Sequence, residues 1–247
     1  MILMPMSQTD FDPSEASIAW KLLTRAGIPV KFATPTGSPA EGDFRMLTGN
    51  GLGIWKRILI ARKDAIDSYK EMVKSLAYQK PLKYDELKAS DYKGILLHGG
   101  HAPGIKEYLE SEKLQSLIVD FIQAGKPLGA ICHGVLLLAR SRAKDGKSVL
   151  YGKKCTCLLK SQEMAAYNLT RLWLGTYYRT YPETTTQEEV MGYLKSPEDF
   201  IEGPRPVFRD SEKKLSRGFT VRDGNILTAR WPGDAYNYGL EYIKMLG

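Results

Sequence analysis

Hydrophobic and polar positions along the first part of the chain alternate between two periods. Residues 2–6 (ILMPM) are a short apolar run, which predicts a strand. In residues 14–27 (SEASIAWKLLTRAG) the apolar positions recur at helical spacing and the segment ends in glycine, which predicts a helix with a C-cap. Residues 29–33 (PVKFA) are a second apolar run. This order of strand, helix and strand is typical of the unit that builds parallel sheets.

Residues 44–90 interrupt that alternation. Residues 56–78 (KRILIARKDAIDSYKEMVKSLAY) predict one long helix, and Pro81 and an acidic, polar stretch follow it. We interpret this region as a helical insertion or cap carried by the sheet.

After the insertion the alternation of strands and helices resumes. Buried strands are predicted at 94–100 (GILLHGG) and 126–134 (KPLGAICHG), with helices at 114–125 and 135–143. The whole pattern predicts an α/β fold with a mostly parallel central sheet, built as one domain over residues 1–247.

The last third is less regular. Residues 153–159 (KKCTCLL) predict a strand and residues 162–175 a helix, whereas residues 175–212 show no obvious element. Residues 218–230 (GFTVRDGNILTAR) are typical of a hairpin that turns at Asp-Gly-Asn, and residues 234–247 predict a closing helix.

Composition and charge narrow the function classes. The 247 residues are 43% hydrophobic and 26% charged, as in an ordinary globular protein, and the net charge of +7 comes from scattered rather than clustered Lys and Arg. A nucleic-acid partner needs a clustered basic surface, so none is expected. The N-terminal apolar run is too short for a signal peptide and no run is long enough to span a membrane, so we expect a cytoplasmic protein.

Three cysteines are too few for a disulfide framework. Cys155 and Cys157 would face the same side of a strand, as in one half of a metal site, but there are only three histidines and no second cysteine pair. We interpret the two as packed strand residues and expect no metal and no cofactor.

The stretch GAICHG, residues 129–134, carries the strongest chemical signal. A buried strand runs into Cys132 and His133 and then at once into an apolar helix, so the thiol lies at a sharp turn beyond the carboxyl end of a parallel strand. The helix dipole favours the thiolate, which is the nucleophilic form of cysteine. The alternative is a buried structural cysteine.

A second glycine-rich turn, in LLHGGHAPG, ends the preceding buried strand. Gly99, Gly100 and His101 lie where backbone N–H groups could converge on a developing negative charge, and the N–H of His133 could join them. His98 precedes the turn and is expected to pack or to cap the strand. Two strand ends of one sheet therefore point at one crevice.

These motifs together resemble the ThiJ/PfpI superfamily, related to class I glutamine amidotransferases. The resemblance rests on AICHG, GGHAPG and the opening segment SEASIAWKLLTRAGIPVKFATP. It implies a flavodoxin-like three-layer α/β sandwich. It also implies that Glu15 is a protonated carboxyl that donates a hydrogen bond to the Cys132 sulfur; the alternative is an ordinary acid at a helix N-terminus.

The larger, capped branch of the superfamily resembles heat-shock chaperones and glyoxalase III enzymes, which complete a Cys-His-acid triad. The matching acid here is Glu163, with His133 as base and Glu163 setting its tautomer. The alternative is an ordinary residue at the start of a helix.

Two departures from the family pattern concern the crevice. His98 stands where the family usually has proline, and ARWPGDAYNYG replaces an asparagine-rich turn. Trp231 follows the hairpin directly and is expected to line the crevice, and Asp234 is interpreted as the N-cap of the last helix.

The resemblance implies a cysteine-dependent lyase or hydrolase of the glyoxalase III or deglycase type, which converts methylglyoxal to lactate without glutathione, and a homodimer. One alternative is a stress-related chaperone or redox sensor in which Cys132 is oxidised to a sulfinate. Another is a hydrolase or hydratase of small amides, nitriles or isonitriles. Glutamine amidotransferase activity is excluded because it needs a late His-x-Glu pair and no histidine follows His133. Protease activity is not expected either, because in relatives it depends on a particular oligomer.

Overall fold

A seven-stranded sheet forms the centre of the molecule. The computed structural model describes residues 1–247, and its strand order is β3-β2-β1-β4-β5-β7-β6. Every neighbouring pair is parallel except β6 and β7. The strands are β1 (Ile2–Pro5), β2 (Val30–Thr34), β3 (Leu82–Lys83), β4 (Gly94–Leu97), β5 (Leu128–Ile131), β6 (Thr220–Asp223) and β7 (Ile226–Ala229). The mostly parallel α/β sheet predicted from the sequence is confirmed.

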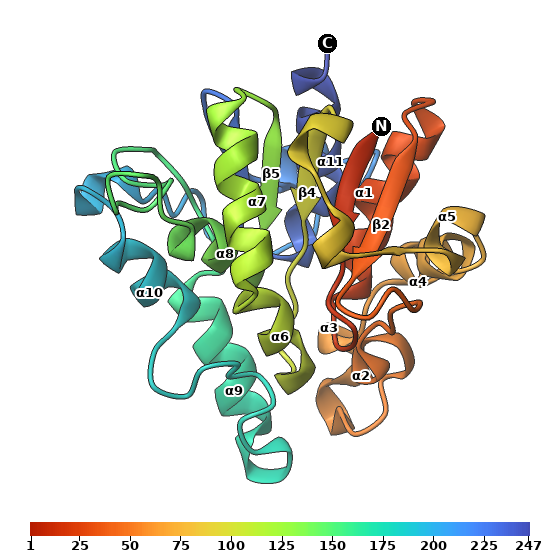
Figure 1. The fold of residues 1–247 in the computed structure, drawn as a ribbon. Helices are drawn as coiled ribbons and strands as arrows, with labels where there is room; N and C mark the ends of the chain where they lie inside the picture. The colour runs from red at the N-terminus through yellow and green to blue at the C-terminus, as the bar shows by residue number, and fades with distance from the viewer.

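Helices cover both faces of this sheet (Figure 1). On one face α1 (Pro13–Arg25) packs against α11 (Ala235–Met245), and on the other α7 (Glu112–Gln123) packs against α8 (Val135–Arg140). A core of 50 buried residues runs from Ile2 to Tyr242. None of the helices is both long and apolar enough to cross a membrane.

The short helices α2, α3 and α6 and the longer α9 lie at one end of the molecule, and both termini lie at the other (Figure 1). Between β1 and β4 the chain reverses the direction in which it adds strands, and in α/β sheets such a switch point is where ligands bind. The remaining helices are α2 (Phe44–Thr48), α3 (Lys56–Leu59), α4 (Lys63–Met72), α5 (Leu76–Gln79), α6 (Lys106–Leu109), α9 (Lys160–Leu174) and α10 (Thr186–Gly192).

The prediction of one long helix over residues 56–78 is wrong, because this segment forms three helices, α3, α4 and α5. Ile60 is extended, and the next N–H, that of Ala61, donates to the Met46 carbonyl at 3.0 Å instead of continuing the helix. Ser75 is also extended and its hydroxyl accepts the N–H of Tyr78, so it caps α5. The short strand β3 follows α5 and was not predicted.

Two expectations for the last third are also corrected. Residues 153–159 form no strand: Cys155 makes one isolated bridge to Phe200, although Cys155 and Cys157 are buried as expected. Residues 175–212 are not devoid of structure, since they contain α10. The predicted hairpin is confirmed as β6 and β7.

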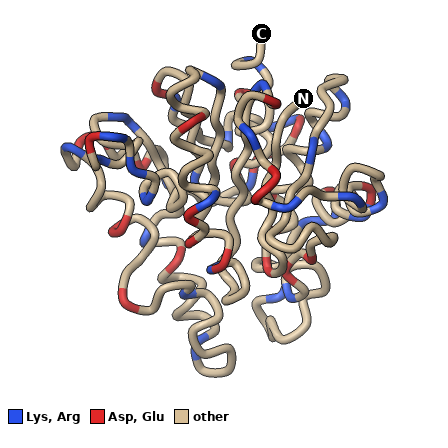
Figure 2. Tube along the Cα trace, in the orientation of Figure 1, with Lys and Arg blue, Asp and Glu red and all other residues tan.

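Charged residues of both signs are interspersed along the whole trace (Figure 2). The Lys and Arg positions form no continuous block along the trace in that view, in keeping with the scattered charge of the sequence.

Candidate active site

Cys132 lies at the turn that joins β5 to α8. Its φ of 57° is in the left-handed region that favours glycine, and its side chain is buried (5% exposed). A non-glycine residue keeps such a conformation only when its surroundings enforce it, and such residues cluster at functional sites. The expected strand-to-helix turn is therefore present.

The turns after β4 and β5 pack directly on each other, as the sequence predicted. A Cβ atom on Gly99 would lie 2.7 Å from the backbone nitrogen of His133 and 3.0 Å from the Cys132 Cβ. A Cβ on Gly134 would lie 2.4 Å from the His98 carbonyl oxygen. Glycine is required at both positions because two backbones approach too closely for any side chain.

Glu15, in the first turn of α1, closes the other side of the thiol. It is 1% exposed, its Oε2 accepts the Gly99 N–H at 2.7 Å, and the carboxyl interacts with the Cys132 thiol. Burial, together with the nearby charge of Asp12, raises the pKa of Glu15 well above its ordinary value, which favours the protonated carboxyl. Burial also raises the pKa of the Cys132 thiol, which opposes the thiolate preference predicted from the helix dipole.

The His133 ring is held between the thiol and Thr180. Nδ1 lies 3.5 Å from the Cys132 sulfur and Nε2 lies 3.2 Å from the Thr180 hydroxyl oxygen. That hydroxyl donates its single proton to the His101 carbonyl at 2.9 Å, so it can only accept from His133. The proton of the neutral ring is therefore on Nε2, and Nδ1 is free to take the thiol proton. Burial lowers the pKa of His133 to about 3.

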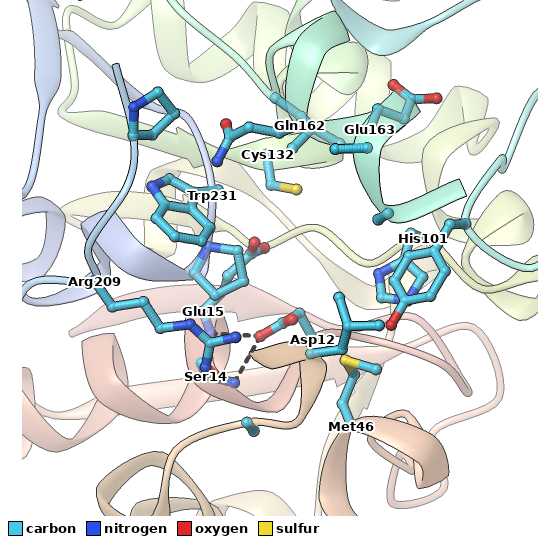
Figure 3. Close-up of a pocket in the computed structure, with 18 of the residues that line it drawn as sticks. Asp12, Ser14, Glu15, Met46, His101, Cys132, Gln162, Glu163, Arg209 and Trp231 are labelled. Carbon is cyan, nitrogen blue, oxygen red and sulfur yellow. Dashed lines mark hydrogen bonds between the residues drawn. The ribbon is translucent and has the colours of Figure 1, made fainter. Parts of the chain in front are cut away.

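Glu163 does not complete this arrangement, which corrects the triad drawn from the resemblance. It makes no hydrogen bond to His133. Its Oε2 accepts the Thr186 N–H at 2.9 Å, its Oε1 lies 3.3 Å from Nε of Arg179, and it points away from Cys132 in Figure 3. The carboxylate instead ties α9 to the segment that carries Thr180.

The three predicted oxyanion donors have different roles. The Gly99 N–H is occupied by Glu15, as described above. Gly100 lines the cavity beside Cys132, and its N–H has no partner within the chain. His101 also lines the cavity, where its ring stacks on Tyr178 with the centroids 4.3 Å apart. The backbone N–H of His101, like that of Gly100, has no partner within the chain.

Two of the remaining expectations are met and one is corrected. His98 is a packing residue: it stacks on Tyr108 with the centroids 4.8 Å apart. Trp231 lines the cavity. Asp234 occupies the N-cap position of α11 without capping it, because its carboxylate is paired with Arg230. The carboxylate of Asp210 accepts the first N–H groups of α11 instead.

A cavity of about 340 Å³ opens above the thiol (Figure 3). Several of its lining residues come from the two regions that the sequence left as insertion or irregular segment, and they carried no motif. They include Met46, Ile58, Leu59, Tyr178, Pro206, Val207 and Arg209. The aromatic-rich stretch around Tyr178 was visible in the sequence, but nothing in it marked Thr180. Across residues 1–247 no group of three or more His, Cys, Asp or Glu side chains is placed to hold a metal ion.

The chain is similar to several known proteins. The chain is 36% identical over 165 residues to an uncharacterized protein of Archaeoglobus fulgidus, covering 67% of this chain and 68% of the relative. It is 24% identical over 235 residues to the glutathione-independent glyoxalase hsp3101 of Schizosaccharomyces pombe, covering 94% and 85%. The crystal structure of glyoxalase III from Candida albicans superposes with a TM-score of 0.68 at 19% identity, covering 99% and 96%.

The family model described as ThiJ/PfpI family-like matches residues 6–199. That span contains the cysteine turn, the glycine turn before it and Glu15, so the motifs and the model point to the same assignment. The chain belongs to the ThiJ/PfpI family.

Proposed function

We propose that this protein is a cysteine-dependent enzyme that acts on 2-oxoaldehydes, as a glutathione-independent glyoxalase or a deglycase-type enzyme would. The observation that carries the proposal is the pairing of a strained, cavity-facing Cys132 with a histidine whose free Nδ1 lies 3.5 Å from the sulfur. A relative that aligns over most of the chain is named a glyoxalase, which supports the same reaction class.

In the first half of the reaction the thiol adds to the aldehyde. The sulfur forms a bond to the aldehyde carbon, and the thiol proton passes through Nδ1 of His133 to the former carbonyl oxygen, which gives a hemithioacetal. The N–H of Gly100, which has no partner within the chain, is a donor available to that oxygen while it carries negative charge. Protonated Glu15 adds no charge beside the attacking sulfur.

In the second half His133 moves a proton from the aldehyde carbon to the neighbouring carbon, and the hydroxyl proton of the hemithioacetal passes to the oxygen on that neighbouring carbon. The first carbon is thereby oxidised to a thioester and the second is reduced to an alcohol, so no external oxidant or reductant is needed. Water then cleaves the sulfur–carbon bond and releases a 2-hydroxy acid, and the thiol is restored. The net change is the addition of one water to the 2-oxoaldehyde.

The test is turnover of methylglyoxal to lactate without added glutathione. The wild type is expected to form lactate, and Cys132→Ser to lose at least about a thousandfold in rate because the nucleophile is gone. Cys155→Ala is the matched control: that thiol is buried outside the cavity, so the variant should keep wild-type turnover. Small amides and nitriles are assayed in parallel.

Wild-type protein that converts no 2-oxoaldehyde, small or large, would overturn the proposal, as would Cys132→Ser with undiminished activity. Turnover of amides or nitriles alone would identify a hydrolase or hydratase at the same thiol.

A further inference from the structure

The cavity is larger than methylglyoxal needs. Its volume of about 340 Å³ lies in the range of pockets that hold drug-sized ligands, ~300–1,000 Å³, and a three-carbon compound fills only a fraction of it. This inference rests on the proposed function and asks which 2-oxoaldehydes fit.

The space beyond the thiol is walled by apolar side chains from separate elements. Met46 on α2, Leu59 on α3 and Leu169 on α9 all line it, and 12 of the 22 lining residues are hydrophobic. At the rim Ile58 and Val207 are 60% and 59% exposed. Removing an apolar substituent from water into such a space is favourable, whereas a methyl group leaves most of the wall uncovered.

The acidic side chains of the cavity each have a partner. Glu163 is paired with Arg179. Asp12 accepts two N–H groups of α1 and lies near the guanidinium of Arg209, which itself donates to the carbonyls of Ile58 and Ile60 (Figure 3). Glu15 is bound to the Gly99 N–H and is the protonated partner of the thiol described above. An uncharged substituent therefore meets no unpaired carboxylate in the cavity.

We propose that the cavity selects uncharged 2-oxoaldehydes with a branched alkyl or aryl substituent over methylglyoxal. The aldehyde carbon lies at Cys132, its oxygen accepts from the Gly100 N–H, and the substituent packs against Met46, Leu59 and Leu169. The chemistry is unchanged: 4-methyl-2-oxopentanal and water give 2-hydroxy-4-methylpentanoate.

The test compares kcat/KM for 4-methyl-2-oxopentanal and methylglyoxal on the wild type. Both are alkyl-substituted, so their aldehydes are similar in reactivity and the ratio reports the cavity. The larger substrate is expected to be favoured at least about tenfold in kcat/KM, since each additional methylene buried in a hydrophobic pocket raises kcat/KM by about tenfold or more.

Ala166→Phe, which places a ring in the cavity from α9, is expected to lower this ratio at least about fivefold. Leu172→Phe is the matched control on the same helix, because Leu172 is 90% exposed and does not line the cavity; its ratio should match the wild type.

A wild-type ratio of kcat/KM, larger aldehyde over methylglyoxal, of about one or less would overturn the selection for large substituents and leave the proposed function in place. This outcome is measured on the wild type alone, so it does not depend on whether Ala166→Phe folds. Failure of the wild type to convert either aldehyde would remove both proposals. Turnover of the larger aldehyde alone would support the inference and restrict the proposed substrate class.

Discussion

A single threonine determines which nitrogen of the active-site histidine carries the proton. The Thr180 hydroxyl has one proton, already donated to the His101 carbonyl, so it accepts from Nε2 of His133 and leaves Nδ1 for the thiol. In the triad expected from the family resemblance a carboxylate has this task. A hydroxyl fixes the tautomer equally well, but it cannot stabilise an imidazolium by charge.

Thr180→Val is therefore expected to lower kcat at least about tenfold with KM nearly unchanged, because the ring loses the acceptor that fixes its tautomer. Thr180→Ser restores the hydroxyl and should restore kcat. Steady-state kinetics on the 2-oxoaldehyde substrate give both constants. Wild-type kcat in Thr180→Val, or a loss of kcat in Glu163→Gln as large as in Cys132→Ser, would return the orienting role to Glu163.

At this scale the sequence predicted residues that adjoin a motif and missed those that do not. Cys132 and His133 are neighbours on a recognisable turn, and the family resemblance implied Glu15. Thr180 lies 47 residues after His133 in a segment without a motif. Its role depends on a tertiary contact, which no local pattern encodes.

At the scale of elements, Arg140 at the end of α8 connects the nucleophile helix to the segment around Thr180. Its guanidinium forms two hydrogen bonds with Glu189 on α10, at 2.7 and 3.0 Å, and one with the Tyr181 hydroxyl at 2.9 Å. The side chains of Arg140 and Glu189 are 15% and 17% exposed, so solvent screens this pair only weakly.

Arg140→Met is expected to lower the free energy of unfolding by about 1.5–3 kcal/mol, the usual loss for hydrogen bonds to a charged group. Lys160→Met is the matched control: the ion pair of Lys160 with Glu188 is exposed, with side chains 55% and 47% accessible, and such pairs contribute about 0–1 kcal/mol. Urea unfolding of the two variants and the wild type measures both values. Equal losses of unfolding free energy in the two variants would mean that the Arg140 contacts contribute no more than an exposed ion pair.

The start of helix α10 carries a local pattern that is visible in the sequence. Thr185 and Glu188 form a capping box at its start, and the spacing of threonine and glutamate is legible in TTTQEE. The break between α3 and α4 is different. The backbone at Ala61 bonds to Met46 on α2, so the break depends on a contact with another element and not on the apolar period.

At the scale of the whole molecule, burial of histidine couples stability to pH. Burial lowers the pKa of His98 to about 4, below the ordinary value of 6.5, so the folded protein binds this proton more weakly than the unfolded chain does. The stability contributed by neutral His98 is present above about pH 6.5 and is lost as the pH falls toward 4.

His98→Phe keeps the stacked ring and removes the titration. Relative to the wild type, the free energy of unfolding of His98→Phe is expected to rise by about 1.4 kcal/mol for each unit by which the pH falls between about 6.5 and 4. This slope corresponds to the uptake of one proton on unfolding of the wild type. Urea unfolding at several pH values between about 4.5 and 6.5 gives the two curves. Parallel curves would mean that His98 keeps its ordinary pKa in the folded protein.

The position of β5 in the sheet has a consequence for how the chain is made. The strand that carries the cysteine turn lies between β4, which precedes it, and β7, which is synthesised almost a hundred residues later. Until residues 226–229 leave the ribosome, β5 is an unpaired edge of a growing parallel sheet, the kind of edge that seeds association between nascent chains. The last hairpin thus protects the nascent chain and also completes the sheet beneath the thiol.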